Sequence, residues 1–102
     1  MTLSATLKIN GDTLSLSGVL DYDSVIELDN QGRNWFKNAA PAQCKVDLEA
    51  VTYSNSAGIA LLLSWQRAAQ QQHKSLGIKS LPPNMLALLK LGELENFLMM
   101  IK

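Results

Sequence analysis

Hydrophobic residues in this chain recur at every second position in some segments and at every third or fourth position in others, and the two spacings alternate along the sequence. The two-residue spacing is typical of a strand with one buried face, and the longer spacing is typical of an amphipathic helix. Residues 3–9 and 14–20 show the strand spacing on either side of Asn10-Gly11-Asp12, a sequence typical of a tight turn. We therefore predict an N-terminal β-hairpin.

A helical pattern follows the hairpin. Ser24 and Glu27 stand at the spacing of a capping box, in which each side chain bonds the backbone N–H of the other residue. Apolar residues then recur at helical spacing until Pro41 ends the pattern. The members of this row are Val25, Leu28, Gly32, Trp35, Phe36 and Ala39. The pattern predicts a helix that begins near residue 25 and covers one face of a sheet.

The rest of the chain repeats the alternation of strand and helix. The predicted elements are a strand at 44–48 that continues toward Tyr53, a helix at 57–72, a strand at 76–78, a short helix that Pro82-Pro83 begins and Gly92 ends, and a last short strand within 97–101. This order predicts an α/β fold with a mixed sheet of four to five strands and helices packed on one face. We expect one domain, residues 1–102, because the 47% of hydrophobic residues suffices for one core.

Charge and cysteine content limit the partners and the compartment. Nine basic and nine acidic side chains cancel, so the overall charge favours neither nucleic acid nor an anionic membrane. Cys44 is the only cysteine, and its place in an apolar strand predicts a buried thiol in a reducing compartment. Residues 1–8 lack the pattern of a secretory signal, and the densest apolar run, 57–63, is far shorter than the roughly 20 residues that span a bilayer. We expect a cytoplasmic protein without direct membrane insertion, held at the inner membrane only through a partner.

The clearest motif lies where the third predicted strand meets the second predicted helix. Its sequence is Asp47-Leu48-Glu49-Ala50-Val51-Thr52-Tyr53-Ser54-Asn55-Ser56-Ala57-Gly58-Ile59. This motif resembles the signature of the STAS domain family, in which a strand ends in Asp-Leu-x-x-Val and a helix opens with Asp-Ser/Thr-x-Gly. The resemblance implies a STAS domain with the SpoIIAA-like fold of the anti-sigma-factor antagonists. Within the family, the size of the chain and its run at 60–63 are most similar to the small cytoplasmic subunit of the bacterial phospholipid ABC transporter.

The resemblance also implies a partner-binding site around Ser56. In the anti-sigma-factor-antagonist branch the corresponding serine is phosphorylated by the partner kinase, and in the transporter branch the corresponding residue contacts the ATPase subunit. Ser56 is therefore the candidate phosphorylation site or partner switch. Asn55 is neutral where the family has an aspartate, which argues against regulated phosphorylation. With the helix face described below, the candidate partner-binding residues are Asp21, Tyr22, Ser54, Asn55, Ser56, Ala57, Gly58, Ile59 and Leu63.

Two interpretations of Ser56 remain open on the residues alone. At a helix N-terminus, unpaired N–H groups and the helix dipole favour a hydroxyl oxygen or an added phosphate. The simpler interpretation is that Ser56, or Ser54, only caps the helix, and a residue can both cap and contact a partner. The Asp21-Tyr22-Asp23 turn is likewise either a solvated turn with a cap or part of the same surface.

The first half of the second predicted helix is apolar on every side, beyond the stripe that a surface helix needs. Either this helix is packed between the sheet and the last helix, or part of it is an exposed patch for a partner. Ile59 and Leu63 lie four residues apart. They diverge from the row formed by Ala57, Leu61, Trp65 and Ala68. We therefore predict that Ile59 and Leu63 face outward.

The sequence offers no residue set for catalysis. His73 is the only histidine and follows three glutamines at a predicted helix end, so it supplies no base for Ser54 or Ser56. Neither serine stands in a Gly-x-Ser-x-Gly elbow, no Gly-x-x-x-x-Gly-Lys phosphate loop is present, and one cysteine cannot build a cysteine-based zinc cluster. Asp47 and Glu49 share one side of a strand, where two carboxylates alone are better explained as solvated groups than as a cation site. We expect no enzymatic activity, no cofactor and no metal.

Two functions are consistent with these sequence features. The leading hypothesis, which rests on the family resemblance, is an accessory subunit that binds the ATPase of a phospholipid-transporting ABC complex. The alternative is an anti-sigma-factor antagonist that an anti-sigma-factor kinase switches by phosphorylating Ser56. A third function, a small hydrolase, would need a general base that the chain lacks beside its serines.

Overall fold

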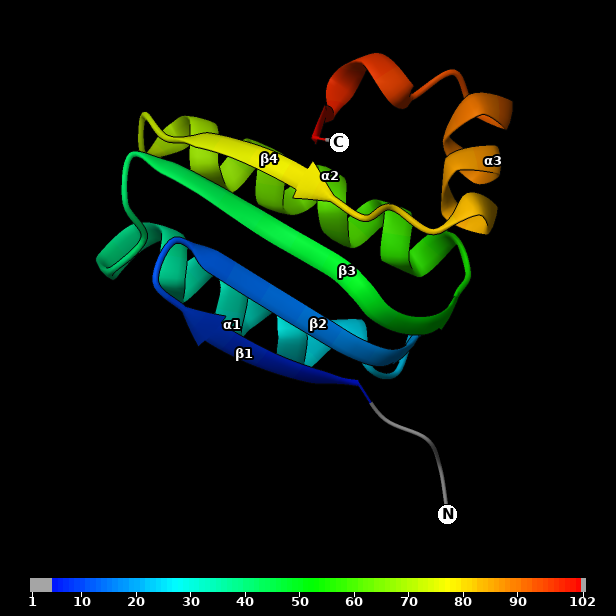
Figure 1. Ribbon diagram of the computed structural model, residues 1–102, viewed down its shortest axis with the longest axis horizontal. Helices are drawn as coiled ribbons and strands as arrows, with labels where there is room; N and C mark the ends of the chain where they lie inside the picture. The colour runs from blue at the N-terminus through cyan, green and yellow to red at the C-terminus, as the bar shows by residue number, and fades with distance from the viewer. Residues whose placement is uncertain (1–4, 102) are drawn as a thin grey trace.

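The computed structural model of the protein describes residues 5–101 and contains the predicted alternation of strands and helices (Figure 1). The elements are β1 (Thr6–Asn10), β2 (Thr13–Leu20), α1 (Val25–Asn38), β3 (Gln43–Ser54), α2 (Ser56–Gln71), β4 (Ser75–Lys79), α3 (Pro83–Leu91), the 3-10 helix η1 (Glu95–Phe97) and β5 (Met99–Ile101). Positions 3 and 4 of the first predicted strand lie outside the described residues. Between residues 5 and 101, no helix combines the length and the apolar character that a bilayer span needs.

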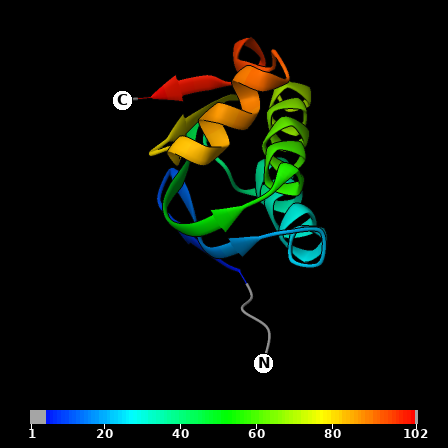
Figure 2. The same cartoon turned by 90° about the vertical axis from the view of Figure 1, so that its right-hand side faces the viewer.

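The five strands form one mixed sheet whose spatial order, β1-β2-β3-β4-β5, is also their order along the chain. β1 and β2 are antiparallel, whereas β2, β3, β4 and β5 run parallel to one another. Parallel neighbours are joined by crossovers of one hand, so successive crossovers toward the same edge place their helices on the same face. Figure 2 shows α1 and α2 side by side on one face of the sheet, with α3 across its end. The predicted fold class is confirmed.

The two faces of the sheet differ in polarity because side chains alternate along each strand. The face under the helices holds the buried residues Leu14, Leu16, Cys44, Val46, Leu48, Leu76 and Ile78. On the opposite face, neighbouring strands place Ser15 beside Asp47 and Asp47 beside Lys79. Parallel sheets are usually covered on both faces and nearly all apolar. Here the polar alternate residues explain how the second face tolerates water.

The helices α1 and α2 approach each other most closely where Gly32 lies against the indole of Trp65. A Cβ atom on Gly32 would stand 2.3 Å from Cε2 of Trp65, so only glycine leaves room for the ring. The Trp65 indole N–H donates to the backbone oxygen of Asp29 at 3.4 Å. Trp65 is fully buried and is the largest side chain of the core. This contact fixes α2 relative to α1.

The start of α1 differs from the predicted capping box. Ser24 has helical backbone angles and makes no side-chain capping bond, and its hydroxyl instead donates to the backbone oxygen of Val19 at 2.8 Å. The Asp21 carboxylate accepts the backbone N–H groups of Asp23 at 3.0 Å and Ser24 at 2.9 Å. The capping-box prediction is therefore wrong, because the Asp21 carboxylate accepts the Ser24 N–H that Glu27 was expected to bond, and the Ser24 hydroxyl bonds the Val19 oxygen instead of the Glu27 N–H.

Cys44 gives a direct test of the packing between β3 and β4. Its side chain is buried, its thiol lies 3.5 Å from the backbone oxygen of Ser75, and burial raises the pKa of the thiol. Only the thiolate is strongly nucleophilic, so both access and ionisation disfavour its reaction. We expect Cys44 in the folded protein to resist a thiol reagent such as dithiobisnitrobenzoate and to react fully in denaturant. Rapid labelling under native conditions would contradict the packing of this strand pair.

Candidate functional site

Three segments that are distant in the sequence meet at the start of α2. They are the turn between β2 and α1, the junction between β3 and α2, and the first turn of α3. The hydroxyls of Tyr22 and Ser56 share a hydrogen bond of 2.8 Å between the first two segments. The Asn84 side chain donates to the backbone oxygen of Ser54 at 3.0 Å and ties α3 to the same junction. The predicted motif and the Asp21-Tyr22-Asp23 turn therefore do lie together.

The cap of α2 is Asn55 rather than either serine. The Asn55 side chain accepts the backbone N–H of Ala57 at 2.8 Å, and Asn55 itself has extended backbone angles. Ser54 is buried, and its hydroxyl donates to the backbone oxygen of Asn55 at 2.9 Å. The simpler interpretation, in which Ser54 or Ser56 caps the helix, is therefore wrong, because asparagine is an equally good cap and stands at the residue just before the helix. Ser56 remains free of that role and is exposed.

Gly58 supports this junction by its lack of a side chain. A Cβ atom at this position would lie 2.0 Å from the hydroxyl oxygen of Ser54 and 3.2 Å from Cβ of Leu20. The backbone N–H of Asn55 donates to the oxygen of Leu20 at 3.1 Å. Gly58 thus lets the first turn of α2 lie close to the ends of β2 and β3, which sets the position of Ser56.

The predicted outward face of α2 is wrong for Ile59. Ile59 is only 5% exposed and belongs to the hydrophobic core, as does Leu61. Leu63 is half-buried and lies near Leu94 and Phe97, away from the start of the helix. The cause is that α2 packs against α1, α3 and the sheet, so only a narrow strip stays exposed. That strip runs through Ser56, Ala60, Arg67 and Gln70.

Large apolar side chains are exposed around the Tyr22–Ser56 pair. Tyr22 is 66%, Ile26 67% and Tyr53 55% exposed, fractions at which such side chains are available to a partner. Ile26 and Tyr53 were not predicted for the site, although Ile26 stands outside the buried row of α1 and this spacing could have singled it out. Nothing in the sequence indicated Asn84, because its contact depends on where α3 folds back.

Two shallow hollows flank Ser56. The first, which we call the α1–α2 groove, has a volume of about 280 Å³ and is lined by Tyr22, Val25, Ile26, Asp29, Ala57, Ala60, Leu61 and Ser64. The second, of about 410 Å³, lies toward α3 and is lined by Tyr53, Ser54, Asn55, Ser56, Asn84, Ala87 and Leu88. Of the predicted site residues, Tyr22 and Ser56 thus border open surface, whereas Gly58 and Ile59 are buried behind it.

The surroundings of Ser56 contain hydroxyl and amide groups rather than an acid–base set. His73 stands 17 residues further on, beyond the other end of α2, about 25 Å away at the helical rise. Within residues 5–101 no three side chains of the metal-ligating types cluster together. The side chains around Ser56 thus present one hydroxyl pair among exposed apolar side chains.

Several solved structures share this fold. The chain is similar to a chain of the Acinetobacter MlaFEDB complex in an ATP-bound conformation, at 24% identity and a TM-score of 0.82, over 94% of this chain and 99% of that one. It is similar to unphosphorylated SpoIIAA, an anti-sigma factor antagonist, at 16% identity and a TM-score of 0.73, over 96% and 88%. An anti-sigma factor antagonist from Mycobacterium paratuberculosis matches at 17% identity and a TM-score of 0.77, over 97% and 85%. These likenesses establish the fold as that of a STAS domain.

Comparison of the sequence with family models assigns the chain to one family of STAS domains. The family model described as Mlab, STAS domain, matches residues 4–101, so the chain belongs to that family of STAS domains. No curated protein gives a significant sequence match. STAS domain proteins have regulatory or accessory roles. The predicted resemblance to the STAS family is confirmed, and so is the predicted similarity, within that family, to the small subunit of the transporter, which is called MlaB.

Proposed function

We propose that this protein is a non-enzymatic accessory subunit that binds the ATPase of an MlaFEDB-type ABC transporter for phospholipids, which maintains outer-membrane lipid asymmetry. The observation that carries the proposal is the exposed Tyr22–Ser56 hydroxyl pair at the start of α2, surrounded by exposed apolar side chains. The family model and the likeness to a chain of the MlaFEDB complex support this partner over others. The protein would be cytoplasmic and would reach the inner membrane through its partner.

A central neutral hydroxyl in an apolar surround suits recognition of a complementary protein surface. Exposed tyrosine and isoleucine side chains bury large apolar areas on association, whereas the hydroxyl pair gives orientation. Ser56 and Tyr22 share one hydrogen bond, so the pair enters an interface with that bond made and with one O–H group and oxygen lone pairs left for the partner.

The alternative function is an anti-sigma-factor antagonist regulated at Ser56. Exposure of the Ser56 hydroxyl at a helix N-terminus favours it, because the positive end of the helix dipole would stabilise an added phosphate there. The neutral Asn55 beside it and the occupied hydrogen bond to Tyr22 argue against it. Incubation with an anti-sigma-factor kinase and ATP separates the two functions, since a stoichiometric gain of one phosphate at Ser56 would support the alternative.

The test of the proposed function is capture of the transporter ATPase from the same organism by purified Ser56→Asp protein. We expect unchanged or slightly higher stability, because a carboxylate at the helix start favours the dipole by roughly 0.3–1 kcal/mol. Capture is expected to weaken at least tenfold, because the carboxylate must lose water against a surface suited to a neutral hydroxyl. Affinity is measured by surface plasmon resonance and stability by thermal melting.

Two variants serve as controls for that test. Ser56→Ala removes the hydroxyl without adding charge and is expected to weaken capture less than Ser56→Asp. Gln70→Glu adds a charge at the exposed far end of α2 and is expected to leave capture unchanged. Undiminished capture by Ser56→Asp would move the partner surface away from the start of α2, and failure of the unaltered protein to bind the ATPase would refute the proposed partner.

A further inference from the structure

A hollow lies between the second half of α2 and the segment that joins α3 to β5, and we call it the α2–η1 hollow. Its volume is about 320 Å³. It is lined by Leu63, Gln66, Arg67, Gln70, Leu94 and Phe97. Of its apolar side chains, Phe97 is 64% exposed and the other two are half-buried. Gln66 follows Ser56 by ten residues, about 15 Å along the helix, so this hollow is separate from the surface around Ser56.

Gln66 carries a buried polar atom that has no partner. Within residues 5–101, Oε1 of Gln66 is the only buried side-chain nitrogen or oxygen without a hydrogen bond. Buried polar groups are nearly always hydrogen-bonded, so an exception in a hollow indicates a missing partner. An amide oxygen only accepts, and this atom therefore requires a donor. The last torsion of a glutamine side chain is broad, so the amide can turn its oxygen toward a donor that enters the hollow.

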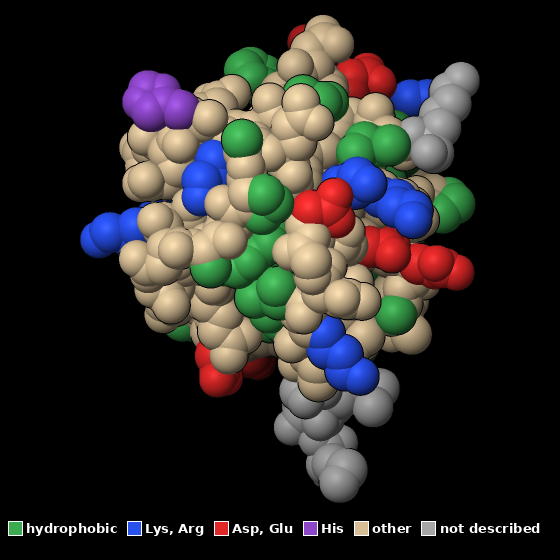
Figure 3. Space-filling model, turned by 60° about the vertical axis from the view of Figure 1, so that its left-hand side comes forward, with side chains coloured by type: hydrophobic (Ala, Val, Ile, Leu, Met, Phe, Trp, Pro, Cys, Tyr) green, Lys and Arg blue, Asp and Glu red, His purple; other side chains and the backbone are tan. Residues whose placement is uncertain are grey.

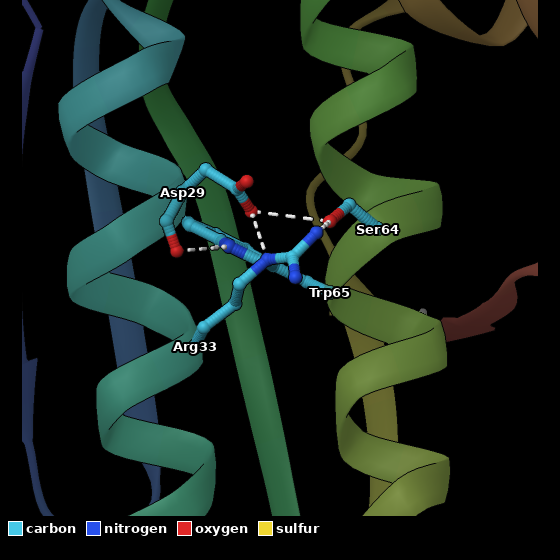
Figure 4. A network of polar contacts seen from close by, with 4 residues as sticks. All are labelled: Asp29, Arg33, Ser64 and Trp65. Carbon is cyan, nitrogen blue, oxygen red and sulfur yellow. Dashed lines mark hydrogen bonds and ion pairs between the residues drawn. The ribbon is translucent and has the colours of Figure 1, made fainter.

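Polar groups on the other side of α2, which faces α1, have partners within the chain (Figure 4). The Arg33 side chain donates from Nη2 to the hydroxyl of Ser64 at 2.6 Å and from Nε to the carboxylate of Asp29 at 3.0 Å. The hydroxyl of Ser64 donates to the same Asp29 oxygen at 3.1 Å, and the Trp65 indole N–H donates to the Asp29 backbone oxygen at 3.4 Å. The fold thus supplies partners beside α1 but leaves Gln66 without one.

The charges around the hollow favour a neutral occupant. Arg67 is the only charged residue of the lining, and it forms no ion pair within residues 5–101. Glu93 and Glu95 are exposed on either side of Leu94 in the chain, outside the lining, and offset the positive charge of Arg67. The face in Figure 3 likewise carries acidic and basic side chains next to one another around a small hydrophobic patch. No charge of one sign therefore selects an ionised side chain at the hollow.

From these features we propose that the α2–η1 hollow receives a tryptophan side chain from an electrically neutral segment of a partner protein. The indole ring packs against Leu63, Leu94 and Phe97. Its N–H donates to Oε1 of Gln66, and its face lies beside the guanidinium of Arg67. Tryptophan is selected because its N–H is a donor without an acceptor and its ring is the best cation–π partner, whereas phenylalanine offers no donor and tyrosine adds an acceptor. The inference goes beyond the proposed function and does not rest on it.

The test is an NMR titration of the ¹⁵N-labelled protein with a neutral, end-capped, seven-residue peptide that has one tryptophan among glycine and serine residues. We expect chemical-shift changes centred on Gln66 and Phe97. A peptide with 1-methyltryptophan keeps the ring but lacks the N–H, and it is expected to bind roughly fivefold more weakly. Gln66→Met removes the acceptor at nearly the same size, so the two peptides are expected to bind this variant equally.

A second pair of variants tests the cation. Arg67→Met is expected to weaken binding of the tryptophan peptide about threefold, the effect of losing an exposed cation–π contact. The matched control, Lys90→Met, removes the same charge from an exposed position of α3 outside the hollow and is expected to leave the affinity unchanged. Thermal melting of each variant shows whether the fold is retained.

Four results would overturn the inference. They are no shift changes at the hollow, equal affinity of the unaltered protein for the two peptides, a preference for tryptophan that persists in Gln66→Met, and equal weakening by Arg67→Met and Lys90→Met. These titrations contain no ATPase, so their outcome is independent of the proposed function. If the peptide fails to bind while the unaltered protein captures the ATPase and Ser56→Asp does not, the hollow inference fails and the function stands. If the peptide binds as expected but no ATPase is captured, the function fails and the hollow inference stands.

Discussion

Ile59→Asp is expected to leave the protein unfolded at 25 °C. Ile59 is 5% exposed within the core, so the new carboxylate would be buried without a cation. An unpaired buried charge costs several kcal/mol, which is comparable with the roughly 5–15 kcal/mol that holds a typical domain together. Far-ultraviolet circular dichroism should show loss of helix, and Leu61→Asp should give the same result because Leu61 is buried as well.

The matched control for this prediction is Ala60→Asp, one residue further along the same helix. Ala60 is exposed, so its carboxylate keeps its water and the domain is expected to fold with a melting temperature close to that of the unaltered protein. A folded Ile59→Asp protein would contradict the helix faces described here. The sharp difference expected between neighbouring positions 59 and 60 makes the assignment of faces testable without any partner.

Gly32→Ala is expected to destabilise the protein by roughly 2–3 kcal/mol, even though alanine is the better helix former by about 1 kcal/mol. The added Cβ would lie 2.3 Å from Cε2 and 2.5 Å from Cζ2 of Trp65, and the rigid, fully buried indole cannot rotate aside. The two helices must then separate, which loosens the core between them. Chemical denaturation measures the loss as a lower midpoint.

A smaller ring at position 65 should partly rescue this variant. Trp65→Phe alone leaves a cavity and costs stability, but in Gly32→Ala/Trp65→Phe the added methyl group occupies some of that space. The double variant is therefore expected to be at least about 1 kcal/mol more stable than the sum of the two single losses. Strict additivity would show that the clash is absent. Gln31→Ala, exposed on the same helix, is the control and is expected to change stability by less than about 0.5 kcal/mol.

The fold could be predicted largely because hydrophobic periodicity records which face of each element is buried. The alternation at 44–48 and the helical row from Val25 to Phe36 both reflect one-sided packing, and both elements form, whereas Ala39, the last member of the predicted row, is exposed beyond the end of α1. Asn10-Gly11-Asp12 likewise predicted the hairpin, and Gly11 adopts a φ of 62°, the left-handed region that glycine tolerates best. The local sequence pattern was sufficient to predict an element wherever that element packs against only one neighbouring layer.

Prediction failed where a third element changed the outcome. From the hydrophobic periodicity, Ile59 was predicted to be exposed and Leu61 to be buried, because one side of α2 was assumed to be covered. Contacts from α1 and α3 bury both residues. The start of α1 failed for a different reason, since Asp21 and Ser24 are both good capping residues and the sequence alone did not show which one bonds the free N–H groups. In each case the missing information was a spatial neighbour.

The candidate site was predicted in part. The sequence left the Asp21-Tyr22-Asp23 turn as either a solvated turn or part of the same surface as the motif, and the Tyr22–Ser56 hydrogen bond shows that the turn lies beside the motif. The role of these residues in partner binding stays a prediction. Tyr53 and Asn84 join the same surface because of where the end of β3 and the start of α3 lie in space, and the sequence predicted these elements but not their positions beside Ser56.

The identity between strand order in the sheet and strand order in the chain has a consequence for how the protein folds. Each new strand adds to an edge that already exists, so no segment has to be inserted between two strands that have paired. The hairpin of β1 and β2 closes through two residues, and each later pairing closes a loop that holds little more than one helix. Each strand pairing therefore carries only a small entropic cost of loop closure. During synthesis, the growing chain can assemble from its N-terminal hairpin toward β5 as successive helix and strand units leave the ribosome.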